Sequence, residues 1–201
     1  MRRINDFYQQ FVDENRFWLE AAVGLFIVGA LAGIATYFVK PELITSIAGV
    51  FQDKFGPAPA FDIHLAIQIF IQNLLVSLIG LFGGIVLGLG PLIVLGVNGF
   101  LLGFVFASIL FSDASAWARL ILILGGLVPH GIFELSAFFV AGALGLRFGL
   151  EWIQSKSAGQ RQGTIKNNFV RILYALPVIA ILLFIAGLVE VFVSGRIVDN
   201  F

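Results

Sequence analysis

The chain has 201 residues, of which 59% are hydrophobic and 12% are charged, and its mean hydropathy is +1.00. Soluble domains carry about 25% charged residues, so the composition excludes an ordinary soluble protein and predicts an all-α integral membrane protein in a lipid bilayer. The 12 basic and 12 acidic residues balance, which argues against a nucleic-acid-binding surface. The absence of cysteine excludes disulfides, thiolate nucleophiles and cysteine-ligated metals.

The apolar runs, taken in chain order, predict one membrane domain over residues 18–201. An amphipathic segment over residues 1–17 precedes it and is expected to be cytoplasmic. The stretch FGPAPAFD lies between the first two runs, and its prolines and glycine predict that no helix crosses it. The fold is therefore expected to be a polytopic helical bundle with five transmembrane helices, at residues 18–39, 63–89, 92–111, 129–150 and 168–193.

The stretch from Trp117 to Leu150 is too long for one straight span, because it would extend about 50 Å against a hydrocarbon core of about 30 Å. Gly125, Gly126 and Pro129 offer a break inside it. Residues 117–128 alone would reach only about 18 Å. We therefore expect a re-entrant half-helix over 117–128, with the fourth span beginning at Pro129 as the first turn of a new helix.

Basic residues predict the orientation. With the N-terminus cytoplasmic and the C-terminus outside, eight of the twelve basic residues lie inside and four lie outside, as the positive-inside rule favours. The prediction is a multi-pass protein of the cell membrane. The inner set is Arg2, Arg3, Arg16, Arg147, Lys156, Arg161, Lys166 and Arg171, and the outer set is Lys40, Lys54, Arg119 and Arg196.

Five polar residues inside the spans are candidates for a buried polar site in the outer half of the membrane. His130 and Glu134 are four residues apart and share one helical face. A new helix starting at Pro129 would favour an ionised Glu134, and Gly131 would allow close approach. Ionisable residues within spans are functional by default. The predicted site contains His130, Glu134, Glu190, Asn73 and Asn98.

Each of these residues also has a plainer interpretation. The asparagines can form hydrogen bonds between helices, Glu190 can reach the interface, and His130 can simply pair with Glu134. If the site is shared, a common proton or a charged histidine is favoured slightly over a metal. The sequence names no cofactor beyond a candidate divalent metal ion, with His130, Glu134 and Glu190 as its ligands.

Glycines at intervals of four residues predict close helix packing, either within the bundle or between two copies in a homodimer. The predicted packing residues are Gly80, Gly84, Gly88, Gly99, Gly103, Gly145 and Gly149.

Four stretches resemble the stage II sporulation protein M family: NLLVSLIGLFGG, NGFLLG, PHGIFELSAFFVAGALGLRFG and GLVEVFVS. They cover about residues 73–194 and occur in the order that the family shows. The resemblance implies about five spans, and the family's polar residues fall on the five candidates above. In spore formers the namesake joins a membrane complex with peptidoglycan-degrading partners, which implies partners in the membrane or envelope, although many members occur in organisms that form no spores.

Three functions are compatible with the sequence. The first is a scaffold or subunit of a membrane complex, in which the polar site fixes the fold. The second is a transporter or channel that uses the site for an ion or a proton. The third is an intramembrane metal-dependent hydrolase, although the motif HExxH is absent and no separate general base is evident. An enzymatic role is the less favoured of these.

Overall fold

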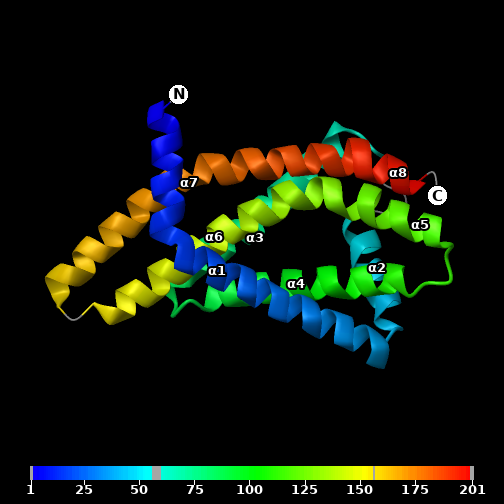
Figure 1. Cartoon of the computed structure of the whole chain (residues 1–201), viewed down its shortest axis with the longest axis horizontal. Coiled ribbons are helices and arrows are strands. Elements are labelled where there is room, and N and C mark those ends of the chain that lie inside the picture. Colours follow the sequence, from blue (N-terminus) through cyan, green and yellow to red (C-terminus); the bar gives the residue numbers. More distant parts are fainter. Residues whose placement is uncertain (1, 56–59, 156, 200–201) are drawn as a thin grey trace.

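The computed structural model describes residues 2–55, 60–155 and 157–199, and the described chain is helical (Figure 1). Short turns connect most of the helices, and two of the elements are π-helices. In chain order the elements are α1 (Arg2–Val39), α2 (Leu43–Phe55), α3 (Ile63–Phe82), η1 (Gly83–Ile85), α4 (Leu89–Leu110), α5 (Ala116–Ile121), η2 (Leu122–Leu127), α6 (Val128–Gln154), α7 (Ala158–Val189), η3 (Glu190–Gly195) and α8 (Arg196–Asp199).

Five helices in the described chain are long and apolar enough to cross a membrane, as the sequence predicts. They run alternately, so the start of α1 and the α6–α7 hairpin share one end of the bundle, which we call the hairpin end (Figure 1). The start of α5 and the C-terminus lie at the opposite end, which we call the C-terminal end. The five stretches are Phe11–Val39, Ile63–Ile85, Leu89–Leu110, Ala116–Gln154 and Gly159–Val198.

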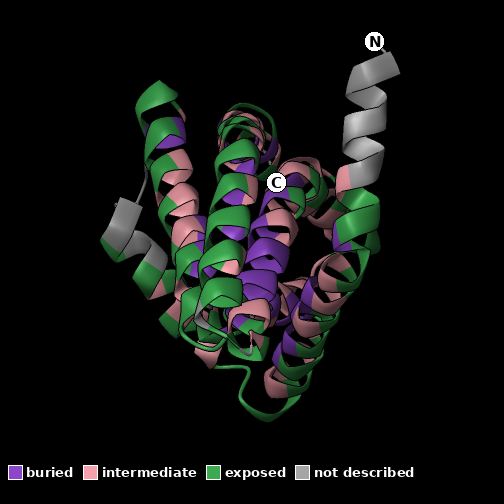
Figure 2. Cartoon of the chain, turned by 90° about the vertical axis from the view of Figure 1, so that its left-hand side faces the viewer, coloured by how far each residue is buried: buried purple, intermediate pink, exposed green. Residues whose placement is uncertain are grey.

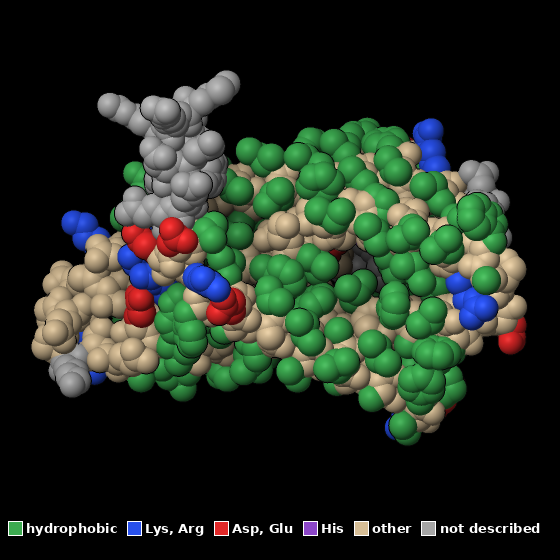
Figure 3. Space-filling view, viewed as in Figure 1, with side chains coloured by type: hydrophobic (Ala, Val, Ile, Leu, Met, Phe, Trp, Pro, Cys, Tyr) green, Lys and Arg blue, Asp and Glu red, His purple; other side chains and the backbone are tan. Residues whose placement is uncertain are grey.

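The surface has the pattern of a protein surrounded by lipid. Hydrophobic side chains cover the middle of the bundle, whereas lysine, arginine and acidic side chains gather near its two ends (Figure 3). Many large hydrophobic residues are strongly exposed, for example Val28 at 65%, Leu75 at 55% and Ile181 at 59%. Exposure on this scale suits hydrocarbon and would be an aggregation hazard in water.

Helix α6 is the centre of the bundle and packs against α1, α3, α4 and α7. Residues 141–149 are all buried, so this part of the helix is covered on every side, and buried residues gather in the interior of the bundle (Figure 2). The largest core cluster joins α6 to α7 and α3 and includes Leu81, Leu144, Ile179 and Leu183. Contacts with this core set the rotation of α6 about its axis.

Glycines allow α1 and α4 to touch backbone to backbone. A Cβ atom on Gly99 would collide with the carbonyl group of Phe26, and one on Gly103 would collide with that of Ala30. A Cβ atom on Gly33, in α1, would collide with the carbonyl group of Phe100. Each small residue therefore accepts the opposing backbone at a distance that a larger side chain would prevent.

A second glycine contact joins α3 and η1 to α6. A Cβ atom on Gly84 would collide with the carbonyl group of Gly145, and one on Gly149 would collide with that of Gly84. Gly88 lies beside this contact with a φ of 75°, a conformation that favours glycine. Gly80 contributes its carbonyl group, which faces Gly145. These contacts lie within one chain, and the predicted homodimer stays a prediction.

The structure differs from the expected half-helix over 117–128. Helices α5, η2 and α6 follow one another without a turn, so the helical stretch runs from Ala116 to Gln154. The expected re-entrant half-helix is therefore joined to the fourth span instead of turning back. A π-helix lies where the glycines and Pro129 predicted a break. A stretch of 39 residues measures about 58 Å, so its ends extend past a bilayer core or the helix tilts.

Two smaller observations concern the connecting segment and Gly131. The segment between the first two spans contains α2, which ends at Phe55, before the prolines of FGPAPAFD. A Cβ atom on Gly131 would meet nothing within 4 Å, so Gly131 serves no close approach within the described chain.

Candidate polar and cation site

Two π-helices pack against each other at the C-terminal end of the bundle, one preceding α6 and one following α7. In η2 the N–H of Val128 donates to the carbonyl group of Ile123, five residues back. The next residue, Pro129, has no N–H, and its ring would crowd the carbonyl four residues earlier in an α-helix. The wider turn of a π-helix accommodates both effects, and such turns are frequent at functional sites.

The site lies where these elements meet. His130 and Glu134 occupy the first two turns of α6, and Glu190 is the first residue of η3. One nitrogen or oxygen atom from each of the three side chains lies within 4.8 Å of the others, and all three side chains are half-buried. The structure thus brings together two residues that spacing placed on one face and a third that is 56 positions further along the chain.

Ser194 joins this group and was missing from the sequence-based set. It is buried, and its Oγ lies 3.2 Å from Nδ1 of His130. The contact orients the imidazole and leaves Nε2 as its other polar atom. The sequence could have indicated Ser194, because it follows Glu190 by four residues, one helical turn, within the GLVEVFVS stretch.

No hydrogen bond or ion pair joins His130, Glu134 and Glu190 directly among the residues that the structure describes. The shared proton or charged histidine that the sequence slightly favoured over a metal therefore stays a prediction. The expected free helix N-terminus is missing, because α6 continues from η2 and the backbone N–H groups ahead of Glu134 lie inside a continuous helix.

The two asparagines stand apart from this group in their hydrogen bonding. Asn98 donates from Nδ2 to the carbonyl oxygen of Val94, 2.8 Å away and one turn earlier in α4. Asn73 is half-buried and makes no hydrogen bond within the described residues. Neither is hydrogen-bonded to His130, Glu134 or Glu190 in that part of the chain, so their supporting role stays a prediction.

A second polar network, at the hairpin end, was not foreseen. Arg147 is 9% exposed and donates to Oε1 of Glu151 at 2.8 Å, to Oδ1 of Asn15 at 2.8 Å and to the carbonyl oxygen of Glu14 at 3.1 Å. Asn168 donates to Oε2 of Glu151 at 2.9 Å. The network fastens α1 to α6 and α7. From the sequence, Arg147 counted only among the basic residues of the cytoplasmic side, and α6 continues past the predicted span to Gln154.

The donor set suits a cation. One imidazole and two carboxylates could hold a divalent metal of the Zn²⁺ or Mn²⁺ kind, with further positions left to water or another ligand. The arrangement of the ligands is compatible with such an ion, because one candidate ligand atom of each side chain lies within 4.8 Å of the other two. An ion at this site could join two helices, move across the membrane or polarise a bound water molecule.

Comparison with known proteins gives a family and one relative. The model of the family described as Stage II sporulation protein M matches residues 22–195. An uncharacterized protein of Methanocaldococcus jannaschii, MJ0793, is 29% identical over 131 residues, which covers 65% of this chain and 71% of the relative. No solved structure matches the chain.

Proposed function

Because the chain belongs to the stage II sporulation protein M family, we propose that it is a multi-pass scaffold subunit of a membrane complex, built around one bound cation. In this proposal His130, Glu134 and Glu190 hold the cation and fasten the start of α6 to η3. The observation that carries the proposal is the approach of their three ligand atoms to within 4.8 Å. The family supports the membrane location, and the partners that we expect lie in the membrane or envelope.

A cation would offset the charges that the three side chains bring together. Two carboxylates close together in a membrane repel each other, and an uncompensated charge away from water costs several kcal/mol or more. A divalent cation would offset both negative charges at once, and His130 would complete the set as a neutral ligand. The contact from Ser194 then holds the imidazole in place.

In a scaffold, a cation at this position would stabilise the part of the bundle with the fewest long helix contacts. The elements η2, η3 and α8 pack together at the C-terminal end, where short helical segments replace the long core contacts of α6. A cation joining α6 to η3 would stabilise this end and hold its surface in one shape for a partner. The opposite end has its own fastening, the Arg147 network.

Metal content and stability test the proposal together. Purified protein in a neutral detergent should contain about one metal ion per chain by elemental analysis, and His130→Asn and Glu190→Gln should lose it. Chelation should lower the unfolding temperature of the parent protein and leave that of Glu190→Gln unchanged. The matched control is His64→Asn, since His64 is exposed and contacts Gln68 at the start of α3. If metal-free protein has unchanged stability, the proposed cation site is wrong. If partners co-purify equally with Glu190→Gln, the cation has no role in the scaffold.

A second candidate is passage of an ion or proton, which the pair of packed π-helices favours. Irregular helices within spans often mark places where ions bind and move. Reconstituted vesicles with a pH-sensitive dye would detect proton flux that Glu134→Gln abolishes. Flux equal to that of empty vesicles would remove this candidate. We do not propose hydrolysis, because both carboxylates of the site act as ligands and no further histidine or acidic residue joins the group within the described chain.

A further inference from the structure

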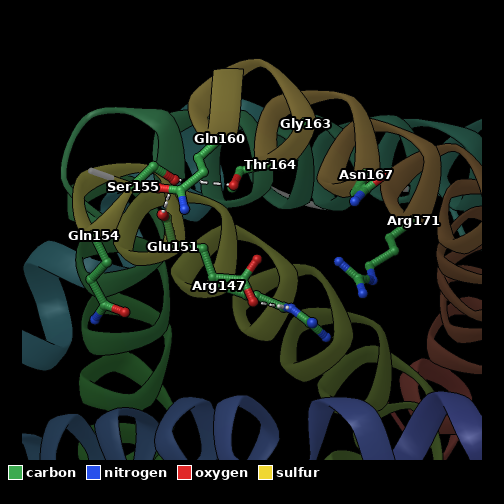
Figure 4. A pocket seen from close by; sticks show the side chains of 9 residues that line it. All are labelled: Arg147, Glu151, Gln154, Ser155, Gln160, Gly163, Thr164, Asn167 and Arg171. Carbon is green, nitrogen blue, oxygen red and sulfur yellow. Dashed lines mark hydrogen bonds and ion pairs between the residues drawn. The ribbon is translucent and has the colours of Figure 1, made fainter. Parts of the chain in front are cut away.

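A groove opens between α6 and α7 at the hairpin end, away from the cation site (Figure 4). Its volume is about 550 Å³, and it lies between the last turns of α6 and the first turns of α7. Both helices extend past the predicted spans here, so the groove falls at the boundary between hydrocarbon and headgroups. Most of its lining residues are polar, among them Arg147, Glu151, Ser155, Thr164, Asn167 and Arg171.

The groove belongs to the most basic part of the chain. Residues 147–171 include five lysines and arginines and a single acidic residue, Glu151. Arg147 is held by Glu151 and Asn15, whereas Arg171 points into the groove and its Nη2 is 3.7 Å from Oε2 of Glu14. An ion pair of that length is loose, and the Arg171 side chain is 29% exposed. Arg171 can therefore turn its remaining donors to an anion.

A neutral donor accompanies this arginine. The hydroxyl groups of Ser155 and Thr164 are engaged within the protein, because Ser155 Oγ donates to the carbonyl oxygen of Glu151 at 2.9 Å and lies 3.1 Å from the Thr164 hydroxyl. Asn167 is exposed one turn before Arg171 on the same helix, with its side chain beside the opening. Arginine with an amide donor beside it is a combination that proteins use for phosphate oxygens.

Apolar and aromatic residues adjoin this polar lining on the same sides of the two helices. Leu150 follows Arg147 by three residues in α6, and Val170 and Tyr174 follow Asn167 and Arg171 by three residues in α7. They are 36%, 42% and 68% exposed. A free phosphate ion would gain nothing from such a surface, whereas a phospholipid would place its phosphate among the donors and its acyl chains along these side chains. A basic segment beside a span also attracts anionic lipids electrostatically.

We propose that the α6–α7 groove binds the phosphate group of an anionic phospholipid from the leaflet at the hairpin end. Arg171 is the principal charged contact, and Asn167 is the neutral donor beside it. Arg147 and Glu151 form the floor, and Asn168 of α7 donates to Glu151 of α6, which joins the two helices there. The proposal is independent of the cation site, which lies at the other end of the bundle.

Binding of defined lipids to the purified full-length protein tests it. The probes are short-chain phosphatidylglycerol, phosphatidylcholine of equal chain length and inorganic phosphate, each titrated in a neutral detergent and measured by native mass spectrometry. We expect phosphatidylglycerol to bind at least tenfold more tightly than phosphatidylcholine. Arg171→Gln should remove most of this preference, and the control Lys40→Gln, which removes an exposed charge outside the groove, should keep it.

Asn167 provides a second pair of variants that leaves the arginines in place. Asn167→Ala should weaken phosphatidylglycerol binding severalfold, and Asn167→Asp should weaken it much further, because the added charge repels a phosphate. Equal binding of both lipids, or equal loss in Lys40→Gln and Arg171→Gln, would overturn the proposal. Binding of inorganic phosphate without a preference for phosphatidylglycerol would show that the ligand is a free anion and would overturn the lipid.

Discussion

Arg147 is the residue whose replacement should reveal most about the hairpin end. Its side chain is 11% exposed and that of its partner Glu151 is 30% exposed, so the substitution Arg147→Met leaves a carboxylate that water reaches only in part. It also removes the hydrogen bonds to Asn15 and to the carbonyl oxygen of Glu14. Methionine keeps the apolar length of the stem, which confines the effect to the charge and the hydrogen bonds.

The magnitude follows from the burial of this pair. Removing one partner of a buried ion pair costs about 3–5 kcal/mol, and partial hydration of Glu151 lowers this to about 2–4 kcal/mol. In the double variant Arg147→Met/Glu151→Gln the stranded charge is gone, so we expect about 1–2 kcal/mol of the loss to return.

Equilibrium unfolding in mixed micelles, followed by circular dichroism, measures these differences. The matched control is Arg16→Met, which breaks an arginine–glutamate pair of the same i,i+4 spacing and 2.8 Å length whose side chains are 76% and 63% exposed. That variant should show no measurable loss. The reasoning fails if Arg147→Met resembles Arg16→Met, or if the losses of the two single variants simply add in the double variant.

Three further predictions address packing, orientation and the cation. Gly103→Leu should prevent the close contact of α1 with α4 and abolish the folded protein, measured as monodisperse yield, while Gly24→Leu should fold normally because a Cβ atom there meets nothing within 4 Å. In a cysteine scan, an impermeant reagent applied to intact cells should label Asp199→Cys and miss Ala158→Cys, and the reverse pattern would refute the cytoplasmic N-terminus. Bound metal should be retained at pH 7.5 and released by dialysis at pH 5, because protons compete for the ligands at low pH. Equal metal content at the two pH values would contradict a site made of histidine and carboxylates.

The number and order of the spans could be predicted because lipid imposes a simple requirement. Each crossing needs about 20 apolar residues, and runs of that length are visible in the sequence. The same requirement misled the interpretation of residues 117–150, because length was treated as the limit on a straight helix. The chain instead continues through η2, where Gly125, Gly126 and Pro129 favour a wider turn without ending the helix.

The candidate site was predictable to the extent that it is local. The spacing of four residues places His130 and Glu134 together on any helix, and the structure places them so. The approach of Glu190 depends on how α7 packs against α6, and the sequence supplied only similar membrane depths for these residues. The network around Arg147 joins residues 132 positions apart, and nothing in the spacing of either stretch indicates that contact.

The two π-helices also determine which parts of the molecule share one helical phase. An α-helix turns about 100° per residue, so an inserted or deleted residue normally rotates everything beyond it. His130 and Glu134 follow η2, and Glu190 begins η3, so all three keep the phase of the buried helices that carry them. For α5 and α8, which lie outside the π-helices, the rotation about the helix axis depends on the width of those turns instead. Inserting or deleting one residue within a π-helix would therefore rotate α5 or α8. His130, Glu134 and Glu190 would keep their orientation toward the core.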